Sequence, residues 1–217
     1  MPGFLAQNAS DIGELTMEHL WLTGSAVLLA SAIGIPTAIW LTRHGRWAKP
    51  VLVVVNVIQT IPSLALFGFL LPLPWLGERA ARIAIAALTG YALLPIVRNT
   101  YEGIRGVDPT VIEVATALGM TDRQRLWKVE LPLAAGFILA GLRTATVLAV
   151  GIATIAAAVG AGGLGELIFR GVASLDNRLV LAGAIPSAML ALAADTFLGW
   201  IETRLRVPAF KDGKGRE

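Results

Sequence analysis

Long apolar runs alternate with shorter polar segments along most of this chain. A helix needs about 20 apolar residues to cross the hydrocarbon core of a bilayer, and four of the runs reach that length. The third is slightly short, and a start at Ala80 brings it into range. The pattern predicts an all-α integral membrane protein with about five transmembrane helices. The apolar runs cover residues 20–42, 51–73, 83–98, 134–160 and 179–203.

Composition agrees with a membrane protein. The chain is 55% hydrophobic and only 15% charged, whereas soluble domains have about 25% charged residues. Its mean hydropathy is +0.69. The absence of cysteine excludes disulfides and thiolate metal sites. The two histidines, His19 and His44, fall near predicted membrane boundaries, so we interpret them as interfacial polar residues rather than metal ligands, and we expect no metal site.

Basic residues are distributed unevenly between the two sets of segments that alternate along the chain. Cytoplasmic loops carry an excess of Lys and Arg, so the richer set is predicted to lie in the cytoplasm. That choice places the N-terminus outside and the C-terminus inside. The counts are 13 in segments 43–50, 98–132 and 204–217, against 4 in the N-terminus, 74–82 and 161–178.

These assignments divide the chain into three parts. Residues 1–19 are expected to form an extracytoplasmic N-terminal segment, and residues 206–217 a cytoplasmic basic tail. Between them, residues 20–205 form one transmembrane domain that includes a cytoplasmic loop, 101–132. The pI near 9.7 is therefore interpreted as a signal of topology, and no nucleic-acid partner is expected.

Polar residues surround a proline inside the second apolar run. Pro62 has no N–H group and interrupts helical hydrogen bonding, and freed backbone groups within a membrane must be satisfied by protein or by a water-lined cavity. One interpretation is a kink that lines a solute pathway, and the alternative is a packing kink. The candidate pathway residues are Gln59, Thr60, Pro62 and Ser63.

Two ionisable residues, Arg143 and Asp195, lie inside apolar runs, where charges are costly and most often functional. Counted along their helices, both fall roughly 13–14 Å from the predicted cytoplasmic side. We therefore expect them to form an ion pair across the helix bundle. The alternative is that Arg143 extends to the lipid headgroups.

A glycine-rich segment follows the fourth apolar run and matches G-x-G-x-x-G. No strand precedes it, so a dinucleotide site is not indicated, and a glycine turn that leads into a short amphipathic helix, Glu166–Val172, fits better. No G-x-x-x-x-G-K-[ST] motif occurs in the chain, and no catalytic triad or metal cluster is evident. The protein is not expected to be an enzyme by itself. The glycines are Gly160, Gly162, Gly163 and Gly165.

The longest polar stretch, Glu113–Pro132, is predicted to form two short helices joined by a turn. Asp108-Pro109 opens the first helix, and Gly119 can end it in the left-handed conformation. Thr121 with Gln124 has the spacing of a capping box for the second helix, and Pro132 marks the next expected break. The apolar series Ile112, Ala115 and Leu118 is suited to docking against another protein.

This stretch resembles the cytoplasmic signature of permease subunits of ATP-binding-cassette (ABC) importers, which read Glu-Ala-Ala, a glycine four residues later, and Ile-x-Leu-Pro. Val114 and Val129 depart from that signature but keep its small or apolar character. The resemblance implies the type I (MetI-like) importer permease fold, with this loop as the contact with the ATPase. The matching residues are Glu113, Ala115, Gly119, Leu131 and Pro132.

Further segments resemble the osmoprotectant branch of that family, whose permeases serve glycine betaine, carnitine and choline. The resemblance implies a multi-pass protein of the bacterial cytoplasmic membrane, surrounded by lipid and driven by alternating access. It also implies three protein partners: ABC ATPase subunits that bind ATP and Mg²⁺, an extracytoplasmic solute-binding protein, and a second, identical or paralogous permease. No cofactor is expected in this chain. The segments are 59–73, 93–104, 106–120, 141–146 and 160–171.

Two other functions remain open from the sequence. The permease could serve another small solute, such as an amino acid, methionine, taurine or nitrate. No obvious aromatic cage for a quaternary ammonium group is present, so solute specificity is expected to reside in the binding protein. An ion-driven secondary transporter would be expected to show inverted repeats and several mid-membrane carboxylates. Only Asp195 fits the second criterion.

Overall fold

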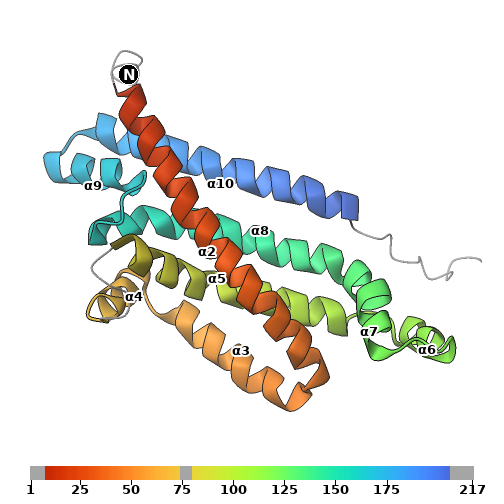
Figure 1. Ribbon diagram of the computed structural model, residues 1–217. Coiled ribbons are helices and arrows are strands. Elements are labelled where there is room, and N and C mark those ends of the chain that lie inside the picture. Colours follow the sequence, from red (N-terminus) through yellow and green to blue (C-terminus); the bar gives the residue numbers. More distant parts are fainter. Residues whose placement is uncertain (1–7, 74–79, 206–217) are drawn as a thin grey trace, which may run out of the picture.

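The structure is a computed structural model that describes residues 8–73 and 80–205. Within these residues every regular element is helical (Figure 1). Long helices form a bundle, and shorter ones lie at its two ends. The elements are α2 (Ala9–Arg43), α3 (Gly45–Thr60), α4 (Ser63–Leu70), α5 (Ala80–Arg105), α6 (Pro109–Ala117), α7 (Asp122–Arg125), the π-helical segment η2 (Leu126–Glu130), α8 (Leu131–Ala156), the 3₁₀ turn η3 (Ala157–Val159), α9 (Gly165–Ser174) and α10 (Asn177–Leu205).

Among residues 8–73 and 80–205, four helical stretches are long and apolar enough to cross a membrane: α2, α5, the continuous run Asp122–Val159, and α10. The pair α3 and α4 forms a fifth crossing if the two are counted as one bent span. The all-α class and the count of about five spans are therefore confirmed. The third span, α5, is helical from Ala80, the first residue described after residues 74–79.

Two helices begin earlier than the apolar pattern predicts. α2 starts at Ala9, well before residue 20, and α3 starts at Gly45, so only His44 separates them. Apolar runs record the part of a helix that tolerates lipid, whereas backbone hydrogen bonding continues into polar sequence. Residues 1–7, most of the loop 74–82 and the basic tail 206–217 lie outside the described residues.

Pro62 separates two helices instead of kinking one. The axes of α3 and α4 differ by 100°, because Ile61 has extended backbone angles (φ −68°, ψ 131°) and Pro62 cannot donate a backbone hydrogen bond. The Tyr91 hydroxyl of α5 donates to the freed Ile61 carbonyl. The break is thus satisfied by a neighbouring helix, as a membrane interior requires.

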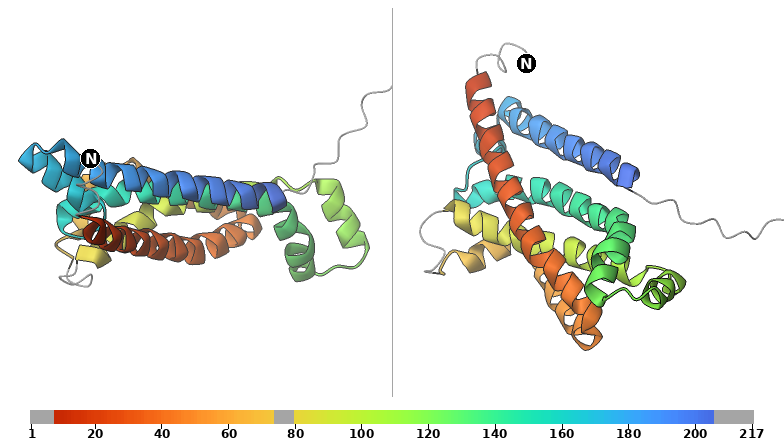
Figure 2. Two further views of the ribbon diagram at one scale, coloured as in Figure 1. Left: turned by 90° about the horizontal axis from the view of Figure 1, so that it is seen from above. Right: turned by 45° about the vertical axis from the view of Figure 1, so that its right-hand side comes forward.

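The core lies where α2, α5 and α8 cross. Small side chains from all three helices are fully buried there, including Ala30, Ala92 and Ala145, and such residues allow close helix packing in membranes. α2 runs diagonally across α5 and α8 (Figures 1 and 2). α10 packs along α8 and carries α9 at its beginning.

The bundle has two distinct ends. The start of α2, α4 and α9 lie at one, called here the α9 end (Figure 1). The other, the α6 end, holds α6, α7, the α2–α3 connection and the end of α10 (Figures 1 and 2). The N-terminal part of α2 and the end of α10 are therefore on opposite sides of the bundle. The membrane side of each end remains a prediction.

Candidate functional site

The polar stretch at the α6 end folds as the predicted helix–turn–helix. Asp108 caps α6, and its carboxylate accepts a hydrogen bond from the Thr110 N–H at 2.8 Å. Gly119 has φ +77°, in the left-handed region that favours glycine. Thr121 and Gln124 form the expected capping box, with donor–acceptor distances of 2.9 and 3.3 Å. Local sequence therefore determines this geometry.

The exposed apolar face of α6 differs from the predicted one. Val111, Val114 and Leu118 point outward, and Leu118 is 74% exposed, whereas Ala115 is only 4% exposed. Spacings of three and four residues keep side chains on one helical face, while two steps of three drift around the axis. The prediction that Ala115 shares an exposed apolar face with Leu118 is therefore wrong, and Val114 shares that face instead.

Two residues of the signature have contrasting environments. The side chain of Glu113 is exposed, and it makes no hydrogen bond or ion pair with the other residues that the structure describes. Leu131 is half-buried at the start of α8.

Pro132 does not interrupt the helix, contrary to the prediction. α7, η2 and α8 form one continuous run from Asp122 to Val159. Pro132 stands in the first turn of α8, and the preceding turn is a π-helix, which widens the backbone at Leu126–Glu130. This wider turn removes the need for the i−4 hydrogen bond that proline would otherwise disrupt.

Sequence reasoning missed Glu130, which is 3% exposed and is the last residue of η2. Its two oxygens accept from Arg43 at 2.6 Å and from Arg125 at 3.1 Å. Arg43 lies 87 positions away in the sequence. The local sequence pattern therefore gives no sign of this contact. A carboxylate directly before an apolar run is the signal that could have marked Glu130 as a candidate for a buried ion pair.

The structure brings Arg143 of α8 and Asp195 of α10 together. Both Arg143 Nε and Nη2 donate to Asp195 at 2.6 Å, in a bidentate arrangement. Glu202 lies 3.5 Å from Arg143 Nη1. The guanidinium is thus bound between helices and does not extend alone to headgroups. The three side chains border a groove of about 440 Å³ between α8 and α10.

The candidate pathway residues lie at the α3–α4 junction. Thr60 and Pro62 are exposed, while Gln59 and Ser63 are half-buried. The Thr60 hydroxyl donates to the Val57 carbonyl at 2.7 Å, so it satisfies its own helix. The structure does not bring these residues to Arg143 or Asp195.

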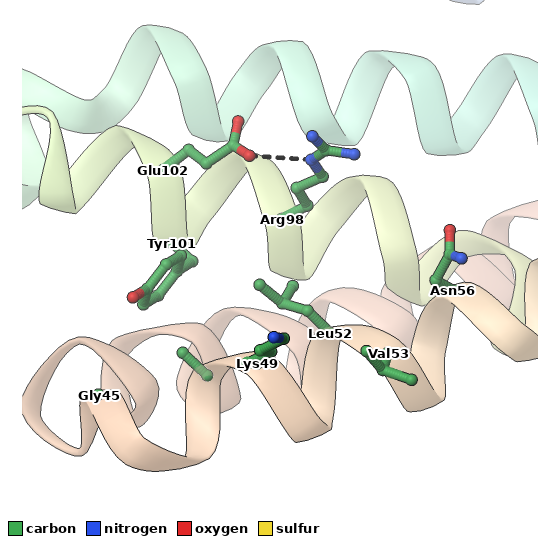
Figure 3. A pocket seen from close by; sticks show the side chains of 9 residues that line it. Gly45, Lys49, Leu52, Val53, Asn56, Arg98, Tyr101 and Glu102 are labelled. Carbon is green, nitrogen blue, oxygen red and sulfur yellow. Dashed lines mark hydrogen bonds and ion pairs between the residues drawn. The ribbon is translucent and has the colours of Figure 1, made fainter.

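A different set of polar residues lines a groove of about 570 Å³ between α3 and α5 (Figure 3). Lys49 and Asn56 come from α3, and Arg98 binds Glu102 at 2.8 Å along α5. None of the four predicted pathway residues lines this groove. Its side chains come from two helices that are far apart in sequence, so periodicity alone could not identify it.

The predicted glycine turn is present at the α9 end and leads into the short helix α9. Gly160, Gly162 and Gly163 have φ between +78° and +82°. The Gly163 N–H donates to the Glu18 carboxylate of α2 at 3.0 Å. Gly165 begins α9, where a Cβ would collide with the Thr154 carbonyl. The turn is therefore held against α2 and α8.

The two histidines occupy unlike environments. His19 is fully buried in α2, and its Nε2 lies 3.1 Å from the Val150 carbonyl oxygen of α8. The crossing of α2 over α8 thus covers His19, while its depth in the membrane stays a prediction. His44 is exposed between α2 and α3 and stacks on Trp40, with ring centroids 4.6 Å apart.

Chains in solved structures of ABC transporters have a similar fold. The chain matches the inward-facing MetNI methionine ABC transporter with a TM-score of 0.78 and 23% identity, over 87% of this chain and 93% of that one. It matches an amino acid ABC transporter crystallised with histidines at 0.73 and 21% identity, over 92% and 96%. These likenesses establish the MetI-like fold.

Curated relatives are more similar in sequence. The carnitine transport permease OpuCB of Listeria monocytogenes is 42% identical over 211 residues, 97% of this chain and 95% of that protein. The glycine betaine/carnitine/choline permease OpuCD of Bacillus subtilis is 44% identical over 93% and 87%. The osmoprotectant import permease OsmW of Salmonella typhimurium is 41% identical over 94% of both chains.

The family itself is given by a match that covers most of the described helices. Residues 30–207 match the binding-protein-dependent transport system inner membrane component family. That range runs from the middle of α2 beyond the end of α10 and includes α6 and its signature. The chain therefore belongs to this family and is a multi-pass inner-membrane permease subunit of an ABC importer.

Proposed function

We propose that this permease imports glycine betaine, carnitine, choline or a closely related quaternary ammonium osmoprotectant. The observation that carries the proposal is the 42% identity over 211 residues to a carnitine permease. Permeases for glycine betaine/carnitine/choline and for choline are 44% identical over 93% of this chain. The methionine transporter and the amino acid transporter described above share the fold at 23% and 21% identity.

The energy source in this proposal is ATP hydrolysed by a partner subunit, with ATP and Mg²⁺ bound there. The chain has no P-loop motif of its own. α6 presents Val111, Val114 and Leu118 outward from the α6 end, and an exposed apolar patch of this kind is typical of a protein contact. Closure of the ATPase dimer would displace α6 and, with it, the helices attached to it.

The proposed orientation follows the basic residues. The α6 end faces the cytoplasm and the ATPase, and the α9 end faces the solute-binding protein. A second permease, identical or paralogous, completes the pathway, and the two rock against each other during alternating access. The Arg143–Asp195 pair and the groove beside it are then covered by protein rather than lipid, because exposed charges are costly in hydrocarbon.

Solute selectivity is assigned to the binding protein in this proposal. Three of the aromatic rings that could contribute to an ammonium cage are already engaged within the chain. Trp40 stacks on His44, and the guanidinium groups of Arg46 and Arg204 lie 5.8 and 5.1 Å from the ring centres of Trp47 and Trp200. In this proposal the permease itself provides only a low-affinity pathway for the solute.

An uptake experiment in vesicles tests this function. The permease is reconstituted with its ATPase and binding protein, and labelled glycine betaine, carnitine, choline, methionine and histidine are supplied with ATP inside. We expect ATP-dependent uptake of at least one quaternary ammonium solute and none of methionine or histidine. Uptake of an amino acid alone would overturn the substrate assignment, and uptake without ATP would overturn the energy source.

A further inference from the structure

Glu130 is a buried carboxylate placed where three elements meet. Glu130 is the last residue of η2 and stands directly before α8. Its carboxylate binds Arg43, the last residue of α2. A buried charge is tolerated only when it is paired and hydrogen-bonded. Glu130 meets that condition with two arginines, one on each oxygen. These two ion pairs therefore hold η2 in a defined position relative to the end of α2 and to α7.

Arg125 extends this contact to α6. Its Nη1 donates to the Thr116 hydroxyl of α6 at 3.2 Å, and its Nε donates to Glu130 at 3.1 Å. Its Nη2 lies 2.9 Å from the Asp122 carboxylate. All three guanidinium nitrogens are thus used by different partners. Only the rigid, five-donor fork of arginine can make these contacts at once.

α2 reaches from this cluster to the opposite end of the bundle. Its last residue, Arg43, binds Glu130. Near its beginning, Glu18 accepts the Gly163 N–H, and His19 lies within hydrogen-bond distance of the Val150 carbonyl. One continuous helix therefore contacts both the α6 region and the glycine turn beside α9, along a route that is not sequential in the chain.

We propose that Glu130 is a positioning residue for energy coupling, which with Arg43 and Arg125 transmits displacement of α6 to α2 and so to the glycine turn. This inference rests on the proposed docking of α6 on the ATPase. The π-helical turn that carries Glu130 is a conformation often found at functional sites. Here it lies between α7 and α8, on the path from the docking element α6 to the helix bundle.

The test compares wild type with Glu130→Gln in the complete importer, in vesicles. Glutamine keeps the shape and removes the charge that both arginines bind. We expect basal ATP hydrolysis to persist, while its stimulation by solute-loaded binding protein and the uptake per ATP both fall about tenfold, within the usual range of coupling between sites. A purely structural defect would lower basal and stimulated hydrolysis by the same factor.

Glu14→Gln is the matched control. Glu14 is an exposed carboxylate near the start of α2 and lines none of the grooves described above, so glutamine there removes a charge that is not buried. This variant should keep the wild-type uptake per ATP. If Glu130→Gln behaves like Glu14→Gln, the proposal is overturned, while wild-type uptake still supports the proposed function.

Arginine variants decide the question if Glu130→Gln fails to assemble. Arg43 makes its contact with one nitrogen at a partly exposed helix end, so Arg43→Lys should keep coupling and Arg43→Gln should lose it. Arg125 uses three nitrogens, so Arg125→Lys should lose coupling. Full coupling in Arg43→Gln, or equal behaviour of Arg43→Lys and Arg125→Lys, would contradict the relay.

Discussion

Arg143 shares its guanidinium between two acidic side chains of α10. Asp195 binds it through two hydrogen bonds of 2.6 Å, and Glu202 lies 3.5 Å away. A Cβ at position 199 would lie only 3.0 Å from Arg143 Nη1, so Gly199 leaves room for the guanidinium. Within apolar helices this cluster links α8 to α10 through one cation and two anions.

Because the cluster holds one cation and two anions, removing the cation should destabilise the protein more than removing one anion. Asp195→Asn leaves Arg143 with Glu202, so we expect a small fall in the midpoint of thermal unfolding in detergent. Arg143→Gln leaves two neighbouring carboxylates without the cation between them, so we expect a larger fall. Fluorescence-monitored unfolding of the purified permease measures both. A larger fall for Asp195→Asn would contradict this account.

At the scale of the elements, α5 and α8 approach each other closely at Gly141. A Cβ there would lie 2.6 Å from the Pro95 carbonyl oxygen and 2.8 Å from Asn99 Cβ. The Asn99 side chain also donates to the Pro95 carbonyl at 2.8 Å, within α5. The two helices are thus in contact through backbone atoms, which cannot move aside as a flexible side chain can.

Gly141→Ala should therefore separate α5 from α8. We expect a loss of about 1–3 kcal/mol in the free energy of unfolding, the usual cost of overpacking a core. Gly151→Ala is the matched control in the same helix, because nothing lies within 4 Å of its added Cβ. Denaturant titration of both variants in detergent gives the comparison. Equal stability of the two alanine variants would show that the contact is unimportant.

For the molecule as a whole, the central question is which end faces the cytoplasm. The two ends differ in what they carry, since the α6 end holds the signature helix and the α9 end holds the glycine turn (Figure 1). The distribution of basic residues predicts that the α6 end is cytoplasmic. The chain contains no cysteine, so single cysteines report position without further changes.

Cysteine labelling in cells tests the orientation. Arg123 in α7 and Ser174 in α9 are exposed, at opposite ends of the bundle. A membrane-impermeant maleimide should label Ser174→Cys in intact cells, and Arg123→Cys only after permeabilisation. The natural cysteine-free chain is the control for background labelling. Labelling of Arg123→Cys in intact cells would reverse the assignment.

The sequence alone determined the features that depend on neighbouring residues. Apolar runs identified the spans, because a lipid-facing helix must be apolar along its length. The caps at Asp108 and Thr121 and the turn at Gly119 were predictable, because each depends on hydrogen bonds or backbone angles within a few residues. The signature from Glu113 to Pro132 indicated the family for the same reason.

Only the tertiary structure decided features that join distant segments. It buried Ala115 and His19, turned Pro62 into a 100° break stabilised by Tyr91, and accommodated Pro132 within a continuous helix. It also brought Arg43 to Glu130 across 87 positions. Burial and ion pairing depend on which helix faces cross. That crossing is set by close packing of small residues over the whole bundle, which periodicity within one segment cannot report.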